Sequence, residues 1–179
     1  MGKQYLPSMT FKFLEYFNKF NFKDKICLEI GSGDSTIYWS YYFKKIISYE
    51  HDLEWAKKIK KEYKTIQRYN IELIHYDKDI FTDKNFKKNI SEADCIIIDN
   101  KPLFIKRDEF CFFVKQYRKK DSIIVLDNGT WNLHAYDYMQ RNFFCKDFPG
   151  IDLDSQNKTV TTLFFEEKTN DYYLTWKEQ

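Results

Sequence analysis

The sequence is poor in the residues that make flexible linkers. Glycine occurs 5 times and proline 3 times in 179 residues, which argues against a long linker between two domains. This length suffices for one hydrophobic core, and it is too short for two domains of usual size. We therefore expect one main domain over residues 24–168, an N-terminal helix over residues 1–23 that packs on it, and a tail over residues 169–179.

Closely spaced cysteine pairs are also missing. The 4 cysteines form no C-x-x-C motif, which excludes the common zinc and redox motifs built on that spacing. Three of them stand within apolar runs, where a free cysteine behaves as a small hydrophobic side chain. This usage fits a reducing compartment, and we expect the protein to be cytoplasmic.

Neither an excess of charge nor a long apolar run is present. The chain has 29 basic and 27 acidic residues, a net charge of +2, so no electrostatic attraction to nucleic acid or to an anionic membrane is expected. No stretch reaches the roughly 18 apolar residues of a membrane-spanning helix. The lysine-rich segments 57–64 and 84–88 are broken by apolar or acidic residues and are typical of solvated helix faces.

What the sequence does contain is a series of short apolar runs rich in β-branched residues. Several of these runs are continuous, as expected for strands buried on both faces of a parallel sheet. Helical patterns separate them, and this alternation predicts an α/β domain with helices on both faces. The predicted strands cover residues 26–30, 46–50, 71–75, 95–99, 122–127, 143–148 and 160–165, and the predicted helices cover residues 9–20, 35–43, 53–63, 110–117 and 133–141.

The alternation breaks down at the end of the chain. Two strand-like segments, 143–148 and 160–165, follow each other with only about a dozen residues between them, Pro149 and Gly150 included. A parallel crossover needs a longer connection. We therefore predict an antiparallel hairpin with a loop that begins at Pro149.

The strongest motif is Leu28-Glu29-Ile30-Gly31-Ser32-Gly33-Asp34-Ser35-Thr36, between the first predicted strand and helix. Gly31 and Gly33 allow backbone to approach a ligand closely, and ligands of open α/β sheets bind at this carboxyl edge. Glu50 ends the second predicted strand, where an acid can accept hydrogen bonds from both hydroxyls of a ribose.

These features fit either a nicotinamide dinucleotide or S-adenosylmethionine. Thr36 occupies the place of the third glycine of the dinucleotide fingerprint. Glu29 stands before the glycines, where a carboxylate can face the ammonium group of a ligand. Both residues, together with the closing hairpin, favour S-adenosylmethionine over a nicotinamide-binding oxidoreductase.

At this point the sequence resembles the class I S-adenosylmethionine-dependent methyltransferases, in particular a small bacterial-type subgroup. The resemblance rests on E-I-G-S-G-D-S-T, Y-E-H-D-L-E-W, I-I-I-D-N and I-V-L-D-N, which begin at positions 29, 49, 96 and 124. It implies a Rossmann-like sheet of seven strands, mostly parallel, with an antiparallel last strand.

The resemblance also implies roles for single residues. Glu29, Gly31, Ser32 and Gly33 would lie beside the methionine part of the cofactor, and Glu50 would bind its ribose. The adenine amino group would meet an acid after the third strand, either Asp77 or Asp79, of which Asp77 is preferred. His51 would flank the adenine, and Asp99 would lie near the methionine amino group or the acceptor.

The acceptor side is less defined. Asp99, Asp127 and Asn128 end two neighbouring predicted strands, and three such oxygen ligands would suit Mg²⁺. That arrangement resembles catechol-type O-methyltransferases and gives an alternative to our main, metal-free prediction. His134 has a side chain suited to a general base, and Trp131 would either stack on a planar acceptor or belong to the core.

The sequence thus predicts a methyltransferase with Asp99, Asp127 and His134 as candidate catalytic residues. Few residues lie outside the predicted main domain, and they are not enough for a separate domain that recognises a large acceptor. A small molecule or a sugar is therefore the favoured acceptor. It leaves the oligomeric state open, with a homodimer among the possibilities.

Overall fold

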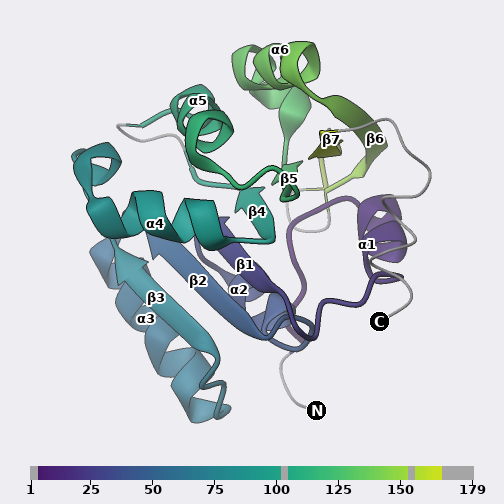
Figure 1. The fold of residues 1–179 in the computed structure, drawn as a ribbon. Helices are drawn as coiled ribbons and strands as arrows, with labels where there is room; N and C mark the ends of the chain where they lie inside the picture. Colours follow the sequence, from purple (N-terminus) through teal and green to yellow (C-terminus); the bar gives the residue numbers. More distant parts are fainter. Residues whose placement is uncertain (1–3, 102–104, 153–155, 167–179) are drawn as a thin grey trace.

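The computed structural model describes residues 4–101, 105–152 and 156–166, which form a sheet between two layers of helices (Figure 1). The predicted tail 169–179 lies outside these residues. No described helix is both long and apolar enough to cross a membrane. The strands are β1 Ile26–Ile30, β2 Lys45–Glu50, β3 Ile71–His75, β4 Cys95–Ile98, β5 Ile123–Leu126, β6 Phe144–Ile151 and β7 Lys158–Phe165.

The seven strands follow the order β3-β2-β1-β4-β5-β7-β6. The first five in this order are parallel, and β7 is antiparallel to both of its neighbours. The predicted mostly parallel, seven-stranded sheet with a closing hairpin is therefore confirmed. The parallel strands all end at one edge, which brings the residues after β1, β2, β4 and β5 together.

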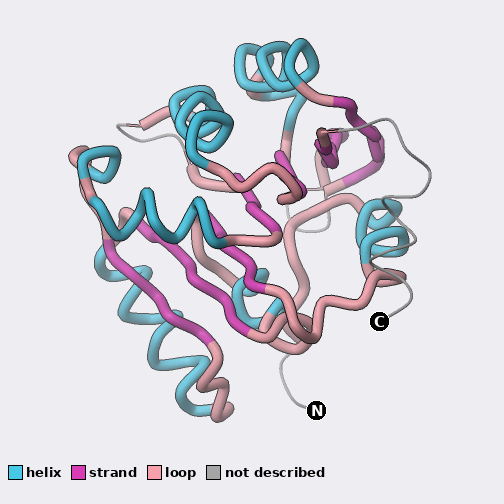
Figure 2. The backbone as a smooth tube through the Cα atoms, in the orientation of Figure 1, coloured by secondary structure: helices cyan, strands magenta, loops and turns pink. Residues whose placement is uncertain are grey.

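Helices cover both faces of the sheet, as Figure 2 shows by its colours. The helices α1 Phe11–Phe17, α2 Asp34–Trp39 and α3 Leu53–Thr65 pack on one face, and α4 Lys84–Glu92, α5 Arg107–Tyr117 and α6 Leu133–Asn142 pack on the other. Two short 3₁₀ helices, η1 Ile80–Thr82 and η2 Gly129–Trp131, precede α4 and α6.

The side chains of β1 point alternately toward the two layers of helices. Cys27 belongs to the apolar cluster on the α1 side, whereas Leu28 and Ile30 belong to the cluster on the α4 side. The cysteines are free, and Cys27 and Cys95 are buried as the sequence suggested. Burial of both faces explains why the strands read as continuous apolar runs.

The N-terminal helix packs on the core through aromatic side chains. Phe13 and Phe17 of α1 are fully buried and their rings stack at a centroid distance of 4.8 Å. Phe17 also meets the edge of Trp39 from α2 at 5.5 Å. This contact joins the first segment of the chain to the sheet.

The loop predicted at Pro149 and Gly150 is wrong, because β6 continues through both residues to Ile151. Pro149 pairs with Val160, and Gly150 pairs with Thr159. A proline fits here because β6 is the edge strand, where a missing N–H removes no ladder bond on the open side. A Cβ at Gly150 would come within 3.1 Å of Thr10 Cβ, so glycine allows the start of α1 to lie close.

Candidate active site

The loop after β1 contains two glycines with different roles. Gly31 has φ of +96°, and a Cβ there would lie 2.6 Å from the main-chain oxygen of Asp99. Gly33 has an extended φ of 179°, and a Cβ there would meet only Ser35 Oγ at 3.9 Å. Gly31 is therefore required by the fold, whereas the missing side chain of Gly33 leaves open space that the fold does not use.

Glu29 lies beneath this loop and is fully buried. Its carboxylate accepts hydrogen bonds from three hydroxyl groups, at 2.6 Å from Ser35, 2.5 Å from Thr36 and 2.8 Å from Ser48. Burial raises the pKa of Glu29 to about 7, against the opposite effect of the three hydroxyls. Glu29 thus ties β1 to β2 and α2, and it holds a proton easily near neutral pH.

Glu50, at the end of β2, holds the same loop from the other side. Its Oε2 accepts hydrogen bonds from Ser32 N at 2.8 Å and from Ser32 Oγ at 3.0 Å, and its Oε1 accepts one from Asp52 N at 2.9 Å. His51 Nδ1 lies 3.1 Å from the Oε1 atom. On the outer side, Trp55 Nε1 donates to the main-chain oxygen of Ser32 at 2.8 Å. Ser32 is therefore fixed between a carboxylate and an indole.

The acids after β3 line a cavity of about 240 Å³ beside that strand. Asp77 and Asp79 both face it, and Asp77 Oδ1 accepts a hydrogen bond from Asp79 N at 3.0 Å. Among the described residues, the lining includes neither Glu50 nor Gly33. Its residues are Tyr49, Ile74, His75, Tyr76, Asp77, Asp79, Ile80 and Asp83.

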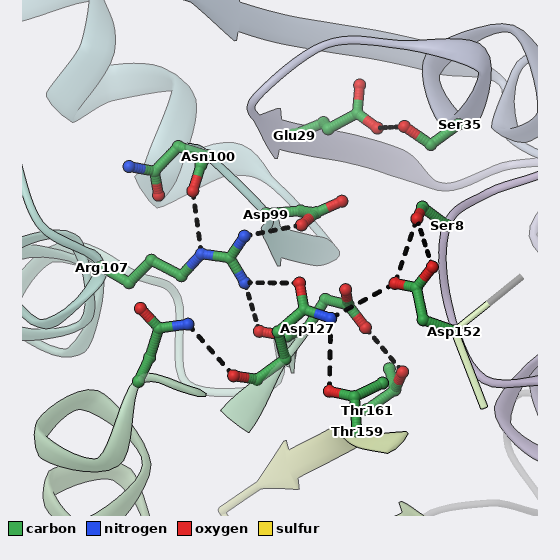
Figure 3. A network of polar contacts seen from close by, with 12 residues as sticks. Ser8, Glu29, Ser35, Asp99, Asn100, Arg107, Asp127, Asp152, Thr159 and Thr161 are labelled. Atoms are coloured by element: carbon green, nitrogen blue, oxygen red, sulfur yellow. Dashed lines mark hydrogen bonds and ion pairs between the residues drawn. The ribbon is translucent and has the colours of Figure 1, made fainter. Parts of the chain in front are cut away.

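Arg107, at the start of α5, organises the ends of β4 and β5 (Figure 3). Its Nη2 donates to Asp99 Oδ1 at 2.8 Å, and its Nε donates to the main-chain oxygen of Asn100 at 2.9 Å. Its Nη1 donates to the main-chain oxygen of Asp127 and lies 3.4 Å from Asn128 Oδ1. One buried guanidinium therefore joins all three residues of the alternative metal site.

Asp99 and Asp127 differ in their exposure. The Asp99 side chain is 20% exposed, whereas Asp127 is fully buried. Burial raises the pKa of Asp99, and Arg107 partly offsets this effect. The pKa of Asp127 is raised well above its usual range by burial and by the charge of Asp99, although Thr161 Oγ1 donates to its Oδ1 at 2.6 Å.

Asp152 adds a third carboxylate from the hairpin end. Ser8 Oγ donates to both of its oxygens, at 2.9 and 3.1 Å. Asn128 Nδ2 lies 3.4 Å from Asp152 Oδ2 and 3.2 Å from Thr159 Oγ1. The left-handed backbone of Asn128, with φ of 51°, turns its side chain into this network. The N-terminal segment, β5 and the hairpin therefore meet at one place.

Two residues predicted after β5 lie on the surface. His134, on α6, is exposed and makes no hydrogen bond or ion pair with the described residues. Trp131 is 51% exposed, so the interpretation of this residue as a core aromatic is wrong. The structure brings Asp99 and Asp127 together but does not bring His134 into their network.

Sequence reasoning missed three residues of the site: Arg107, Asp152 and Trp55. Arg107 precedes residue 110, the predicted start of the helix, and Asp152 falls in the predicted loop. For the helix start a signal was available, because Asp108 and Glu109 are acidic residues of its first turn, where Asp and Glu are enriched. No local pattern pointed to Asp152.

Comparisons with known proteins find similarity of structure. No model of a known protein family matches the chain, and no curated protein is detectably similar in sequence. Precorrin-6y C5,15-methyltransferase from Geobacter metallireducens GS-15 superposes with a TM-score of 0.68 at 14% identity, over 86% of this chain and 87% of that chain.

Two O-methyltransferases give similar values. The enzyme from Bacillus cereus in complex with SAH has a TM-score of 0.64 at 12% identity, over 87% of this chain and 78% of that one. TomG from Streptomyces achromogenes, in complex with SAM, has a TM-score of 0.62 at 12% identity, over 87% and 77%. This chain therefore has the fold of the class I methyltransferases, as the sequence resemblance predicted.

Proposed function

We propose that this protein is a methyltransferase that uses S-adenosylmethionine. The observation that carries the proposal is the open space at Gly33, at the carboxyl edge of a sheet with methyltransferase strand order. Neither the backbone conformation nor the packing requires glycine there. A ligand that comes close to the main chain explains its use.

The residues around this space fit the parts of the cofactor. Glu50 and Ser32 present a carboxylate and a hydroxyl for ribose hydroxyls, since the rotatable Ser32 hydroxyl can give up its bond to Glu50. Asp99 has one oxygen engaged with Arg107 and a partly exposed side chain that can meet an ammonium group. The cofactor supplies an electrophilic methyl group on a sulfonium.

The residues of the chain act mainly by position. Methyl transfer requires donor and acceptor in line at near contact, and it is favoured by exclusion of water. The loop after β1, in which Ser32 is hydrogen-bonded to Glu50 on one side and to Trp55 on the other, would hold the methyl donor in place. We place the acceptor beside Asp99 and Asp127, where the ends of β4 and β5 meet, and we propose a small molecule as the acceptor.

A nicotinamide dinucleotide fits this loop less well. Thr36 stands at the position of the third fingerprint glycine, and its side chain is fully buried. Thr36 Oγ1 accepts a hydrogen bond from Gly33 N at 3.0 Å and donates to Glu29. The threonine is thus part of the loop's own structure, where the dinucleotide fold needs close helix–strand packing by glycine.

A magnesium site at the ends of β4 and β5 does not fit the residues present. The guanidinium of Arg107 already lies against Asp99 Oδ1, Asn128 Oδ1 and the main-chain oxygen of Asp127. Those are the oxygens that a cation would use, and a second positive charge there would be repelled by Arg107. We therefore propose that the methyl transfer requires no metal.

Calorimetric titration of the full chain with S-adenosylhomocysteine, and separately with NAD, tests the proposal. We expect binding of S-adenosylhomocysteine with an affinity that does not change when Mg²⁺ is added, and no heat with NAD. Absence of binding by a protein that melts cooperatively would refute the proposed function. Tight binding of NAD would favour the oxidoreductase alternative.

A further inference from the structure

Four residues beside the loop after β1 form a closed cycle of hydrogen bonds. Glu50 Oε2 accepts a hydrogen bond from Ser32 N at 2.8 Å, and the main-chain oxygen of Ser32 accepts one from Trp55 Nε1 at 2.8 Å. Trp55 N donates to Asp52 Oδ1 at 2.9 Å, and Asp52 N donates to Glu50 Oε1 at 2.9 Å. The cycle therefore joins the end of β2, the start of α3 and the loop that contains Gly33.

The packing of the fold does not account for the indole of Trp55. The residue is 38% exposed, and within the described part of the chain it belongs to neither of the two apolar clusters. Lys58 Nζ lies over its ring, 4.3 Å from the centroid, which is a weak contact at an exposed site. A buried indole N–H needs a partner in the protein, whereas an exposed one can bond to water. The hydrogen bond to Ser32, 23 positions away, is therefore a specific feature and not a consequence of burial.

The peptide unit between Ser32 and Gly33 is held at both ends. Because a peptide unit is planar and trans, its C=O and its N–H point in opposite directions. The C=O faces Trp55, and the N–H of Gly33 donates to Thr36 Oγ1 at 3.0 Å. Glycine has more backbone freedom than any other residue, so this peptide unit turns easily unless both of its ends are bonded. Trp55 thus restrains the backbone at the position where the missing side chain leaves open space.

We propose that Trp55 is a positioning residue for the methyl donor, whose indole N–H keeps the Ser32–Gly33 peptide unit in the orientation that the cofactor binds. This inference rests on the proposed function. A loop that already has its bound conformation loses less conformational entropy when the ligand arrives, so the ligand binds more tightly. Trp55 acts through Ser32 and has no need to touch the cofactor. Removal of its N–H should therefore weaken cofactor binding without destabilising the fold.

Trp55→Phe tests the role of the N–H, because it keeps an aromatic ring at the start of α3 and removes the donor. We expect the affinity of the full chain for S-adenosylhomocysteine, measured by calorimetry, to fall at least about threefold through the loss of one hydrogen bond. The melting temperature should stay within a few degrees of the wild-type value. Leu53→Ala is the control, since it removes apolar atoms from a 47% exposed residue in the same turn of α3 and should change neither quantity.

Amide hydrogen exchange of the ligand-free chain measures the restraint on the loop directly. In Trp55→Phe the Gly33 amide should exchange at least about threefold faster than in the wild type, because its peptide unit can turn away from Thr36. The amide of Ala56, which donates to the main-chain oxygen of Asp52 at 2.8 Å in the first turn of α3, should exchange at the same rate in both proteins. An unchanged rate at Gly33, or an equal increase at both amides, contradicts a specific effect of Trp55 on the loop.

The calorimetric outcomes separate this inference from the proposed function. Equal affinity of the wild type and Trp55→Phe for S-adenosylhomocysteine overturns the inference and leaves the proposed function standing. An equal loss of affinity in Leu53→Ala, or a fall of many degrees in the melting temperature of Trp55→Phe, also overturns it, because the tryptophan would then act only through the stability of α3. The wild type is titrated first, and absence of binding there refutes the proposed function and this inference together.

Discussion

At the scale of single residues, the two glycines of the loop after β1 should have different effects when they are substituted: Gly33 on ligand binding and Gly31 on stability. Gly33→Ala places a methyl group in space that no side chain fills, so the melting temperature should stay within a few degrees. If the cofactor lies there, its affinity should fall about tenfold or more through overpacking. Calorimetry with S-adenosylhomocysteine and a thermal melt measure both. Unchanged affinity would move the cofactor away from Gly33.

Gly31→Ala should give the opposite result. Its φ of +96° is unfavourable for alanine, and its Cβ would lie 2.6 Å from the Asp99 main-chain oxygen. We expect a loss of about 2–4 kcal/mol in the free energy of unfolding from the two effects together. Urea denaturation of this variant beside Gly33→Ala gives the comparison. A loss no larger than that of Gly33→Ala would show that the close approach is not a constraint.

Glu29 predicts a pH dependence of stability. Its pKa is raised from 4.5 to about 7 in the folded chain, so between these values the folded state holds a proton that the unfolded state has lost. Stability from this group is therefore present below about pH 4.5 and decreases as pH rises toward 7, by roughly 3 kcal/mol in all. Glu29→Gln should remove this decrease. Parallel slopes of unfolding free energy against pH in both proteins would contradict the assignment.

The residue scale also shows how far sequence reasoning reaches. Glu29, Gly31 and Glu50 were identified because strand ends and glycines are local signals. The structure places all three around one loop, although Glu50 contacts Ser32 rather than open space. The role of Arg107 could not be predicted from the sequence. Its guanidinium acts through hydrogen bonds to Asp99 and Asn128, and only the fold brings these residues close to it.

At the scale of elements, the parallel strands were predictable to within a residue or two. Each is a short run rich in apolar residues, and β1, β2, β4 and β5 are buried along almost their whole length. The end of β6 was not, since Pro149 and Gly150 are turn formers in isolation. Their place on an edge strand beside Thr10 is a property of the whole sheet. The sequence around α4 predicts only a solvated helix face, because Phe86 and Ile90 are its few buried apolar residues.

The short helix α1 should depend on its aromatic packing more than on its helical propensity. It has seven residues, and isolated helices of this length are not stable in water. Phe17→Ala removes a fully buried ring that contacts Phe13 and Trp39, and should lower the free energy of unfolding by about 3–5 kcal/mol. Phe11→Ala, at a ring that is 61% exposed, is the control. Equal small losses in urea denaturation would mean that α1 contributes little to the core.

At the scale of the whole molecule, the site is assembled from distant parts of the chain. Ser8 and Asp152 are 144 positions apart, and Asp127 and Thr161 are 34 apart. The strand order explains both contacts, since β7 pairs with β5 and the hairpin lies beside the N-terminal segment. No sequence pattern reports such pairings, and this is why the acceptor side was predicted only as a region.

Arg107 connects the ends of β4 and β5 through its hydrogen bonds, so its substitution should lower the stability of the whole fold. Arg107→Ala leaves the Asp99 carboxylate beside Asp127 without its guanidinium and frees three oxygens of the β4 and β5 ends. We expect a loss of about 3–5 kcal/mol in the free energy of unfolding, because one member of a buried ion pair is removed. Arg141→Ala, which breaks an exposed pair on α6, should cost less than about 1 kcal/mol. Urea denaturation of both variants decides: losses of similar size would mean that the Arg107 network orders the site locally without supporting the fold.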